Sequence, residues 1–86
     1  MTALDFWSRQ ILRHIYEIMN SERQNRNASI DELAEMTGGK ERSEILQVIR
    51  SLERKGLVKA NYAIGGQAAV TLTKAGLLMA QQLSKQ

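Results

Sequence analysis

Apolar residues recur at helical spacing along the start of the chain. They fill an arc of about 180° on a helical wheel, and this pattern predicts a helix within residues 1–24. The arc consists of Leu4, Trp7, Ile11, Leu12, Ile15, Tyr16, Ile18 and Met19. A surface helix that packs on one core needs a stripe of only about 100°. The excess therefore either contacts a second copy of the chain or is covered by the last helix.

The second predicted helix covers residues 29–37. Ser29 and Glu32 have the spacing of a capping box, in which each side chain accepts a hydrogen bond from the backbone N–H of the other residue. The residues expected to face inward are Ile30, Leu33, Ala34 and Met36. Gly38 and Gly39 end this helix, because glycine readily adopts the positive φ angles of a sharp turn.

The third predicted helix covers residues 40–55 and separates apolar from polar positions most cleanly. The residues expected to pack inward are Ile45, Val48, Ile49 and Leu52. The residues left facing outward are Ser43, Glu44, Gln47, Arg50, Ser51 and Arg54. Gly56 provides the helix stop.

A β-hairpin is predicted over residues 58–72. Two β-capable runs, 59–64 and 67–72, flank a glycine pair at 65–66 that suits a two-residue turn. Ala28 and Ser29 can add a short third strand. Thr71 or Thr73 then caps a final helix over residues 73–84. Residues 1–86 are therefore expected to form a single, mainly α-helical domain with a small β-hairpin.

The charge of the chain is unevenly distributed. The formal net charge is +3 over 86 residues. Residues 1–53 carry seven basic and nine acidic groups, whereas residues 54–86 carry five basic groups and no acid. An anionic partner should therefore favour the hairpin side. The alternative is that these lysines and arginines form an ordinary solvated surface.

The composition does not indicate a catalytic site. There is no cysteine, and His14 is the only histidine, placed beside the apolar arc where it suits a boundary position. Asp31, Glu32 and Glu35 are explained by favourable electrostatics at a helix start. We therefore expect no enzymatic activity, no metal site and no cofactor.

The expected location is the cytoplasm. The lack of cysteine fits a reducing compartment. No run approaches the roughly 18 consecutive apolar residues that would cross a bilayer, and charged residues interrupt the first twenty positions, unlike a signal peptide. No membrane partner is expected.

The order of helix, glycine stop, hairpin and helix is that of a winged helix-turn-helix. Leu52–Val58, followed by the hairpin and Leu72–Gly76, resembles the winged helix domains of MarR-like and PadR-like transcription regulators. The resemblance covers about residues 11–83. It implies that the third helix enters the major groove of double-stranded DNA and that the hairpin, or wing, touches the backbone or the minor groove. The implied base contacts are Lys40, Arg42, Ser43, Glu44 and Gln47, and the implied phosphate contacts are Arg50, Arg54, Lys59 and Gln67.

The chemistry of these residues supports DNA binding in part. Arg42 can pair with guanine and Gln47 with adenine. Glu41 and Glu44 oppose it, because carboxylates repel a polyanion unless they are paired. Leu46 stands where these regulators tend to have a small polar residue, and the wing tip, 65–68, has no arginine for a narrow minor groove. The alternative function is a winged helix that binds a protein partner and not DNA.

A single domain of this size would make few phosphate contacts and bind weakly. Two copies with recognition helices about 34 Å apart would read a palindrome. We therefore expect a homodimer. Its predicted interface is formed by Leu4, Phe6, Trp7 and Ile11 of the first helix and by Leu78, Met79 and Leu83 of the last.

Overall fold

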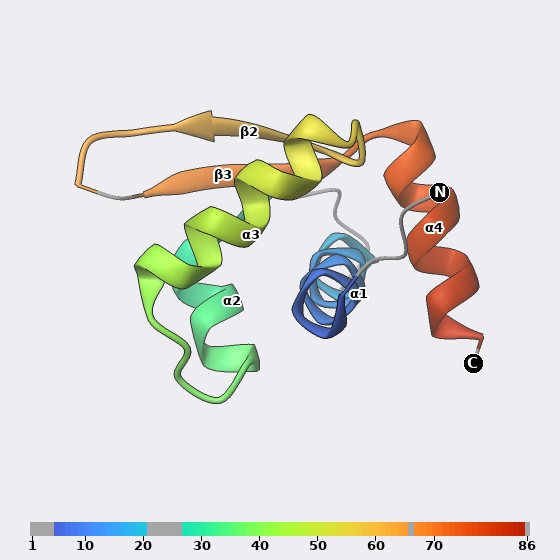
Figure 1. Ribbon diagram of the computed structural model, residues 1–86, viewed down its shortest axis with the longest axis horizontal. Coiled ribbons are helices and arrows are strands. Elements are labelled where there is room, and N and C mark those ends of the chain that lie inside the picture. The colour runs from blue at the N-terminus through green and yellow to red at the C-terminus, as the bar shows by residue number, and fades with distance from the viewer. Residues whose placement is uncertain (1–4, 21–26, 66, 86) are drawn as a thin grey trace.

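The computed structural model describes residues 5–20, 27–65 and 67–85. Within them, four helices and three strands follow one another as a helix, a strand, two helices, a hairpin and a helix (Figure 1). Their bounds are α1 (Phe6–Asn20), β1 (Ala28–Ser29), α2 (Ile30–Met36), α3 (Arg42–Arg54), β2 (Val58–Tyr62), β3 (Ala68–Leu72) and α4 (Lys74–Ser84). Figure 1 shows α1 between α2 and α4, with α4 at the end of the molecule away from the hairpin tip. The expected winged helix architecture is present.

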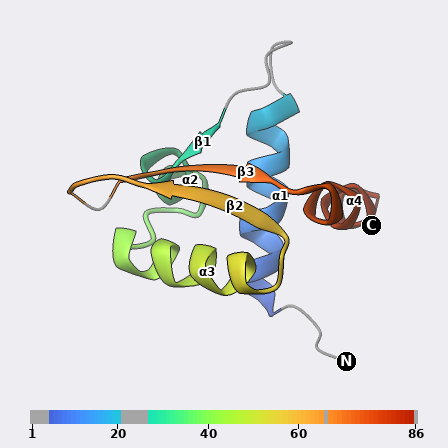
Figure 2. The ribbon, with the colours of Figure 1, turned by 90° about the horizontal axis from the view of Figure 1, so that it is seen from above.

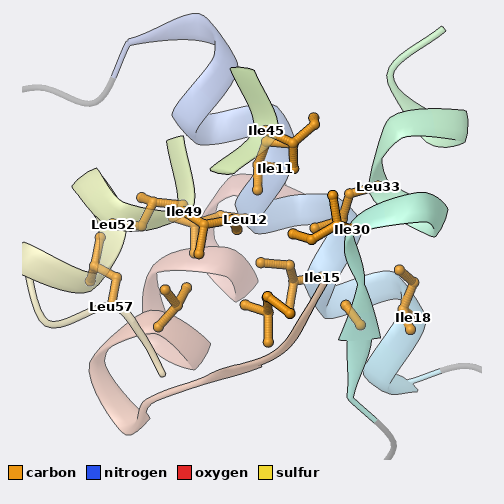
Figure 3. Close-up of a cluster of buried hydrophobic side chains, with 14 residues drawn as sticks. Ile11, Leu12, Ile15, Ile18, Ile30, Leu33, Ile45, Ile49, Leu52 and Leu57 are labelled. Carbon is orange, nitrogen blue, oxygen red and sulfur yellow. The ribbon is translucent and has the colours of Figure 1, made fainter. Parts of the chain in front are cut away.

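The core gathers around α1. Ile11, Leu12 and Ile15 of this helix are completely buried, and Figure 3 shows them among side chains from α2, α3 and Leu57. The other fully buried side chains of this cluster include Ile30, Leu33, Ile45, Ile49, Leu52 and Val70. Helix α3 is therefore fixed by its apolar side.

Two expectations about apolar side chains are wrong. Ile11 lies inside the protomer with no exposed surface and cannot form part of a dimer interface. Met36, expected to face inward, is 38% exposed, because it ends the short helix α2 at the edge of its apolar face. Leu4, also expected at the interface, lies outside the described residues.

The glycine stops form as expected. Gly56 has φ +77°, its N–H donates to the carbonyl of Glu53 (2.9 Å), and the N–H of Leu57 donates to the carbonyl of Leu52 (3.0 Å). This pair of bonds is a Schellman motif, which satisfies carbonyls left free at a helix end. Gly38 and Gly39 close α2 in the same way.

Side chains satisfy the helix starts. The capping box is confirmed, since Glu32 N–H donates to Ser29 Oγ and Ser29 N–H donates to Glu32 Oε1, both at 3.1 Å. Asp5 precedes α1, and its Oδ1 accepts a hydrogen bond from the N–H of Ser8 in the first turn of that helix at 2.8 Å. This backbone hydrogen bond, followed by a side-chain one from Ser8, lowers the pKa of Asp5 below its ordinary value.

The sheet has the order β1-β3-β2, and both pairings are antiparallel. The predicted third strand is therefore present. The predicted two-residue turn is wrong, because strand pairing ends at Tyr62 and Ala68, and Ala63 N–H still donates to the carbonyl of Gln67 at 2.9 Å. Ile64 therefore belongs to the loop, in which Gly65 has φ +84°.

Thr73 joins the end of α3, the base of the wing and the start of α4. Its N–H donates to the carbonyl of Leu57 (3.1 Å), its hydroxyl donates to the carbonyl of Gly56 (2.6 Å), and the same oxygen accepts from Gly76 N–H (3.0 Å). A Cβ on Gly76 would lie 1.8 Å from the carbonyl oxygen of Leu57. Only glycine allows α4 to approach this closely.

We expect Gly76→Ala to lower the free energy of unfolding by about 2 kcal/mol, because the added methyl group must push α4 away from Leu57. In an unobstructed helix the same change would raise the free energy of unfolding by about 1 kcal/mol. The sign of the measured change therefore shows whether the added methyl group is obstructed. Urea denaturation measures the change, with Lys74→Ala in the same turn as the control. A Gly76→Ala protein as stable as the wild type would contradict the close approach.

The lowered pKa of Asp5 predicts a specific acid sensitivity. The hydrogen bond to Ser8 stabilises the fold fully above the ordinary aspartate pKa of about 3.9 and is lost as the pH falls through the lower folded value. Asp5→Asn should therefore flatten the dependence of unfolding free energy on pH in the acid range. Glu35→Gln, which removes an exposed carboxylate on α2, serves as the control. Identical acid profiles for wild type and Asp5→Asn would exclude this contribution.

Candidate nucleic-acid interface

Helix α3 presents a continuous polar stripe to solvent. Ser43, Gln47, Arg50 and Arg54 follow one another at intervals of three or four residues and are all exposed. The opposite side of the helix is buried through Ile45, Ile49 and Leu52. Figure 2 shows α3 along one edge of the molecule, beside β2. The stripe is therefore free to meet a partner.

The wing lies against the second half of this helix. The hydroxyl of Tyr62 on β2 donates to Glu53 Oε1 at 2.8 Å, and the guanidinium of Arg50 lies 5.5 Å from the centre of the Tyr62 ring. Partial burial and the contact with Glu53 raise the pKa of the Tyr62 phenol. The neutral phenol therefore keeps its bond to Glu53 and holds β2 against α3.

Arg42 has two partners within the protein. Its Nη2 lies 2.7 Å from Asp31 Oδ1 on α2, and its Nη1 donates to the carbonyl of Gly65 in the wing loop at 3.3 Å. The sequence suggested that this guanidinium pairs with guanine. In the structure it links α2, the first turn of α3 and the wing tip, an arrangement that sequence spacing could not reveal.

Lys40 is turned away from the polar stripe. Its ammonium lies 4.0 Å from the centre of the Trp7 ring on α1 and 3.8 Å from Glu44 Oε1, and its side chain is only 14% exposed. Lys40, which the resemblance implied at the base edges, therefore packs against α1 in the structure. Trp7 also contacts the ring of Phe6 edge-on, at 5.1 Å between centroids. No sequence pattern indicated that α1 reaches this point.

Three residues that argued against DNA binding have defined surroundings. Glu44 is paired with Lys40, which offsets part of its charge. Glu41 is exposed immediately before α3, where a negative charge is favourable at a helix start. Leu46 is half-buried and packs against the core cluster. It is therefore a supporting residue and not part of an outward docking face.

The wing offers polar side chains at its sides and an apolar one at its tip. Lys59 and Asn61 are exposed on β2, and Gln67 is half-buried at the end of the loop. Ile64 is 98% exposed. Sequence reasoning did not single out Tyr62 or Ile64. The signal that was missed for Tyr62 is an aromatic residue within the first predicted strand, 59–64. Ile64 was expected in the same strand but lies in the loop.

A second surface runs over α1 and α4. Phe6 is 55% exposed, Leu78 is 57% exposed and Leu77 is 38% exposed. Leu83 is half-buried and lines a hollow between the two helices with Phe6, Arg9, Gln10 and Arg13. Met79 packs partly against the core, and Trp7 is half-covered by its neighbours. Of the residues predicted for a dimer interface, Phe6 and Leu78 are the most accessible.

The described residues show no other site chemistry. His14 Nδ1 lies 3.1 Å from Glu17 Oε1 on the same helix, as suits a boundary residue. No group of three or more His, Asp or Glu side chains in the described ranges is arranged to hold a metal ion. None of the described helices combines the length and apolarity needed to cross a bilayer.

Comparison with known proteins identifies the fold but no close relative. No protein-family model matches the sequence, and no curated protein matches it either. Among solved structures, a suggested DNA-binding protein from Ralstonia eutropha JMP134 has a TM-score of 0.73 at 21% identity, covering 94% of this chain and 98% of its own. A protein from Archaeoglobus fulgidus has a TM-score of 0.75 at 22% identity over 95% of this chain and 85% of its own.

The MarR-family transcription regulator from Rhodococcus sp. RHA1 has a TM-score of 0.75 at 21% identity and is matched over 95% of this chain. Only 54% of that regulator is covered, so the chain spans about half its length. Identities this low establish likeness of fold alone. The chain has the winged helix fold, and its structural neighbours include this MarR-family regulator and two further transcription regulators.

Proposed function

We propose that this protein is a transcription regulator that binds double-stranded DNA with α3 in the major groove. The observation that carries the proposal is the exposed stripe from Ser43 to Arg54 on a helix whose other side is completely buried. A helix held in this way can enter a groove without unfolding any part of the core. The structural neighbours include a suggested DNA-binding protein and a MarR-family transcription regulator, which supports the same function.

Each exposed residue of α3 suits a definite part of the duplex. Gln47, in the first half of the helix, can form two hydrogen bonds with adenine, and Ser43 is short enough to allow close approach to the backbone. Arg50 and Arg54 extend the stripe toward phosphates, and Lys59 adds a positive charge from β2. Arg42 contributes first by holding the wing loop, through Asp31 and Gly65.

The rival proposal is a winged helix that binds a protein. Glu41 and Glu44 at the start of α3 and the uncharged wing tip favour it. Dependence on salt separates the two functions. Binding to duplex DNA weakens with salt by a log–log slope of about −0.9 for each neutralised phosphate. A protein docking face with few net charges shows no comparable slope.

We propose further that the protein acts as a homodimer through α1 and α4. Phe6 and Leu78 expose more than half of their surface, which is a large apolar exposure for so small a domain. One copy would contact only a few phosphates, so pairing two recognition helices is the simple route to useful affinity. Leu83 and Trp7 lie at the edges of this surface.

Alanine substitution in α3 tests the DNA-binding proposal. Arg54→Ala should weaken binding to every duplex and reduce the magnitude of the salt slope by about one. Gln47→Ala should lower affinity for the preferred sequence by about 1–3 kcal/mol and relax the choice of base. Fluorescence anisotropy with duplexes selected from random-sequence DNA measures both.

Lys85→Ala removes the same charge at the end of α4, away from α3, and serves as the matched control. Its affinity should equal that of the wild type. The proposal fails if Arg54→Ala and Gln47→Ala bind DNA as tightly as Lys85→Ala at low salt. It also fails if the wild-type protein binds no duplex.

Substitution on α4 tests the dimer. Leu78→Arg places a charge on the exposed apolar surface, and we expect it to convert a dimer into a folded monomer in sedimentation velocity experiments. Met36→Arg changes an exposed apolar residue on α2 and should leave the dimer intact. A wild-type protein that remains monomeric at high micromolar concentration would remove this part of the proposal.

A further inference from the structure

The wing tip carries an apolar side chain with almost no contacts. Ile64 is 98% exposed, more than any other large hydrophobic residue in the described part of the chain; Leu78 follows at 57%. No charged residue occurs from Ala60 to Thr73. An isoleucine side chain this exposed does not contribute to core packing. Its place in the loop between β2 and β3 therefore suits contact with a partner.

Two hydrogen bonds and one positive φ angle define the backbone of the described residues around Ile64. Ala63 N–H donates to the carbonyl of Gln67 at 2.9 Å, which closes the loop. Gly65 turns the chain with φ +84°. Arg42, itself fixed by Asp31 at 2.7 Å, donates to the carbonyl of Gly65 at 3.3 Å. The tip is thereby tied to the first turn of α3, so its position follows that of the recognition helix.

The surroundings of the tip favour nucleic acid as the partner. Arg42, paired with Asp31, lies 3.3 Å from the carbonyl of Gly65, which follows Ile64 in the chain. The guanidinium of Arg50 lies 5.5 Å from the centre of the Tyr62 ring, two residues before Ile64, so two guanidinium groups lie near the loop. Asn61 and Gln67 supply uncharged hydrogen-bonding groups near the loop. Both views of the ribbon show the hairpin tip projecting beyond the start of α3 (Figures 1 and 2). An apolar point between polar and cationic groups fits a DNA groove flanked by phosphates.

We propose that Ile64 is a wedge for the minor groove, a role that rests on the proposed DNA binding. With α3 in the major groove, the tip reaches the adjacent minor groove and Ile64 inserts between two base pairs. Apolar side chains that enter in this way unstack the step and bend the duplex. Pyrimidine–purine steps such as TA and CA unstack most easily. Ile64 thus selects deformable sequence at a position where no hydrogen bond reads the base.

Variants of Ile64 can be compared without loss of the fold, because the side chain is exposed. The probe is the duplex that the wild-type protein selects from random-sequence DNA, labelled with dyes at both ends and with 2-aminopurine at the expected step. Wild type should shorten the end-to-end distance, corresponding to a bend of about 20° or more, and raise the 2-aminopurine fluorescence. Ile64→Ala should bind about tenfold more weakly and do neither.

Two further substitutions separate shape from charge. Ile64→Leu keeps an apolar side chain of equal volume and should retain both signals. Ile64→Arg should bind with a salt slope larger by about one and leave the duplex straight, because arginine reads a narrow minor groove without unstacking it. Equal melting temperatures for the four proteins would show that folding is unchanged.

The outcomes distinguish this inference from the function on which it rests. If wild-type protein binds the duplex but neither bends nor unstacks it, the wedge is refuted while DNA binding stands. The wedge is also refuted if Ile64→Ala binds and bends the duplex as the wild type does. If no duplex is bound by any of the four proteins, the proposed function itself fails and the wedge fails with it.

Discussion

The structure depends on the close approach of α4 to the backbone that follows α3. Gly56 and Leu57 offer their carbonyls to Thr73, and Gly76 lies where any side chain would collide with Leu57. One set of contacts therefore fixes the end of α3, the base of the wing and the start of α4. Because the hairpin leaves and returns through this junction, its direction relative to α3 is set there. The hydrogen bond from Arg42 to the wing loop adds to the hairpin direction that the contacts at its base already set.

Residues near one another in the sequence were predictable from local rules. The capping box at Ser29 and the stop at Gly56 follow from backbone chemistry, and the buried side of α3 follows from helical periodicity. Contacts between distant segments were not predictable. No spacing rule places Lys40 over Trp7 or Arg42 beside Gly65. Ile11 was misassigned because a wide apolar arc does not say which part meets the core, and Ile64 because a glycine pair fits several loop lengths.

These contacts between distant segments divide the basic residues around α3 into two groups with different roles. Lys40 and Arg42 are held by partners inside the molecule, where they join α1, α2 and the wing to the start of α3. Arg54 and Lys59 are exposed and available to an anion. Net charge alone treats all of them alike. The face proposed for DNA therefore combines a rigid frame of paired charges with a smaller set of free ones, and its apolar tip contributes through shape.

We propose that the exposed stripe of α3 and the wing beside it form the surface that meets duplex DNA. The most direct measurement is the change in backbone amide chemical shifts during titration of the isotope-labelled protein with short random-sequence duplex DNA at low salt. If α3 and the wing bind DNA, the largest changes should occur over residues 43–54 and 59–67 and should be reversed by added salt. Changes confined to α4 and the first turns of α1, with α3 and the wing unaffected, would contradict it.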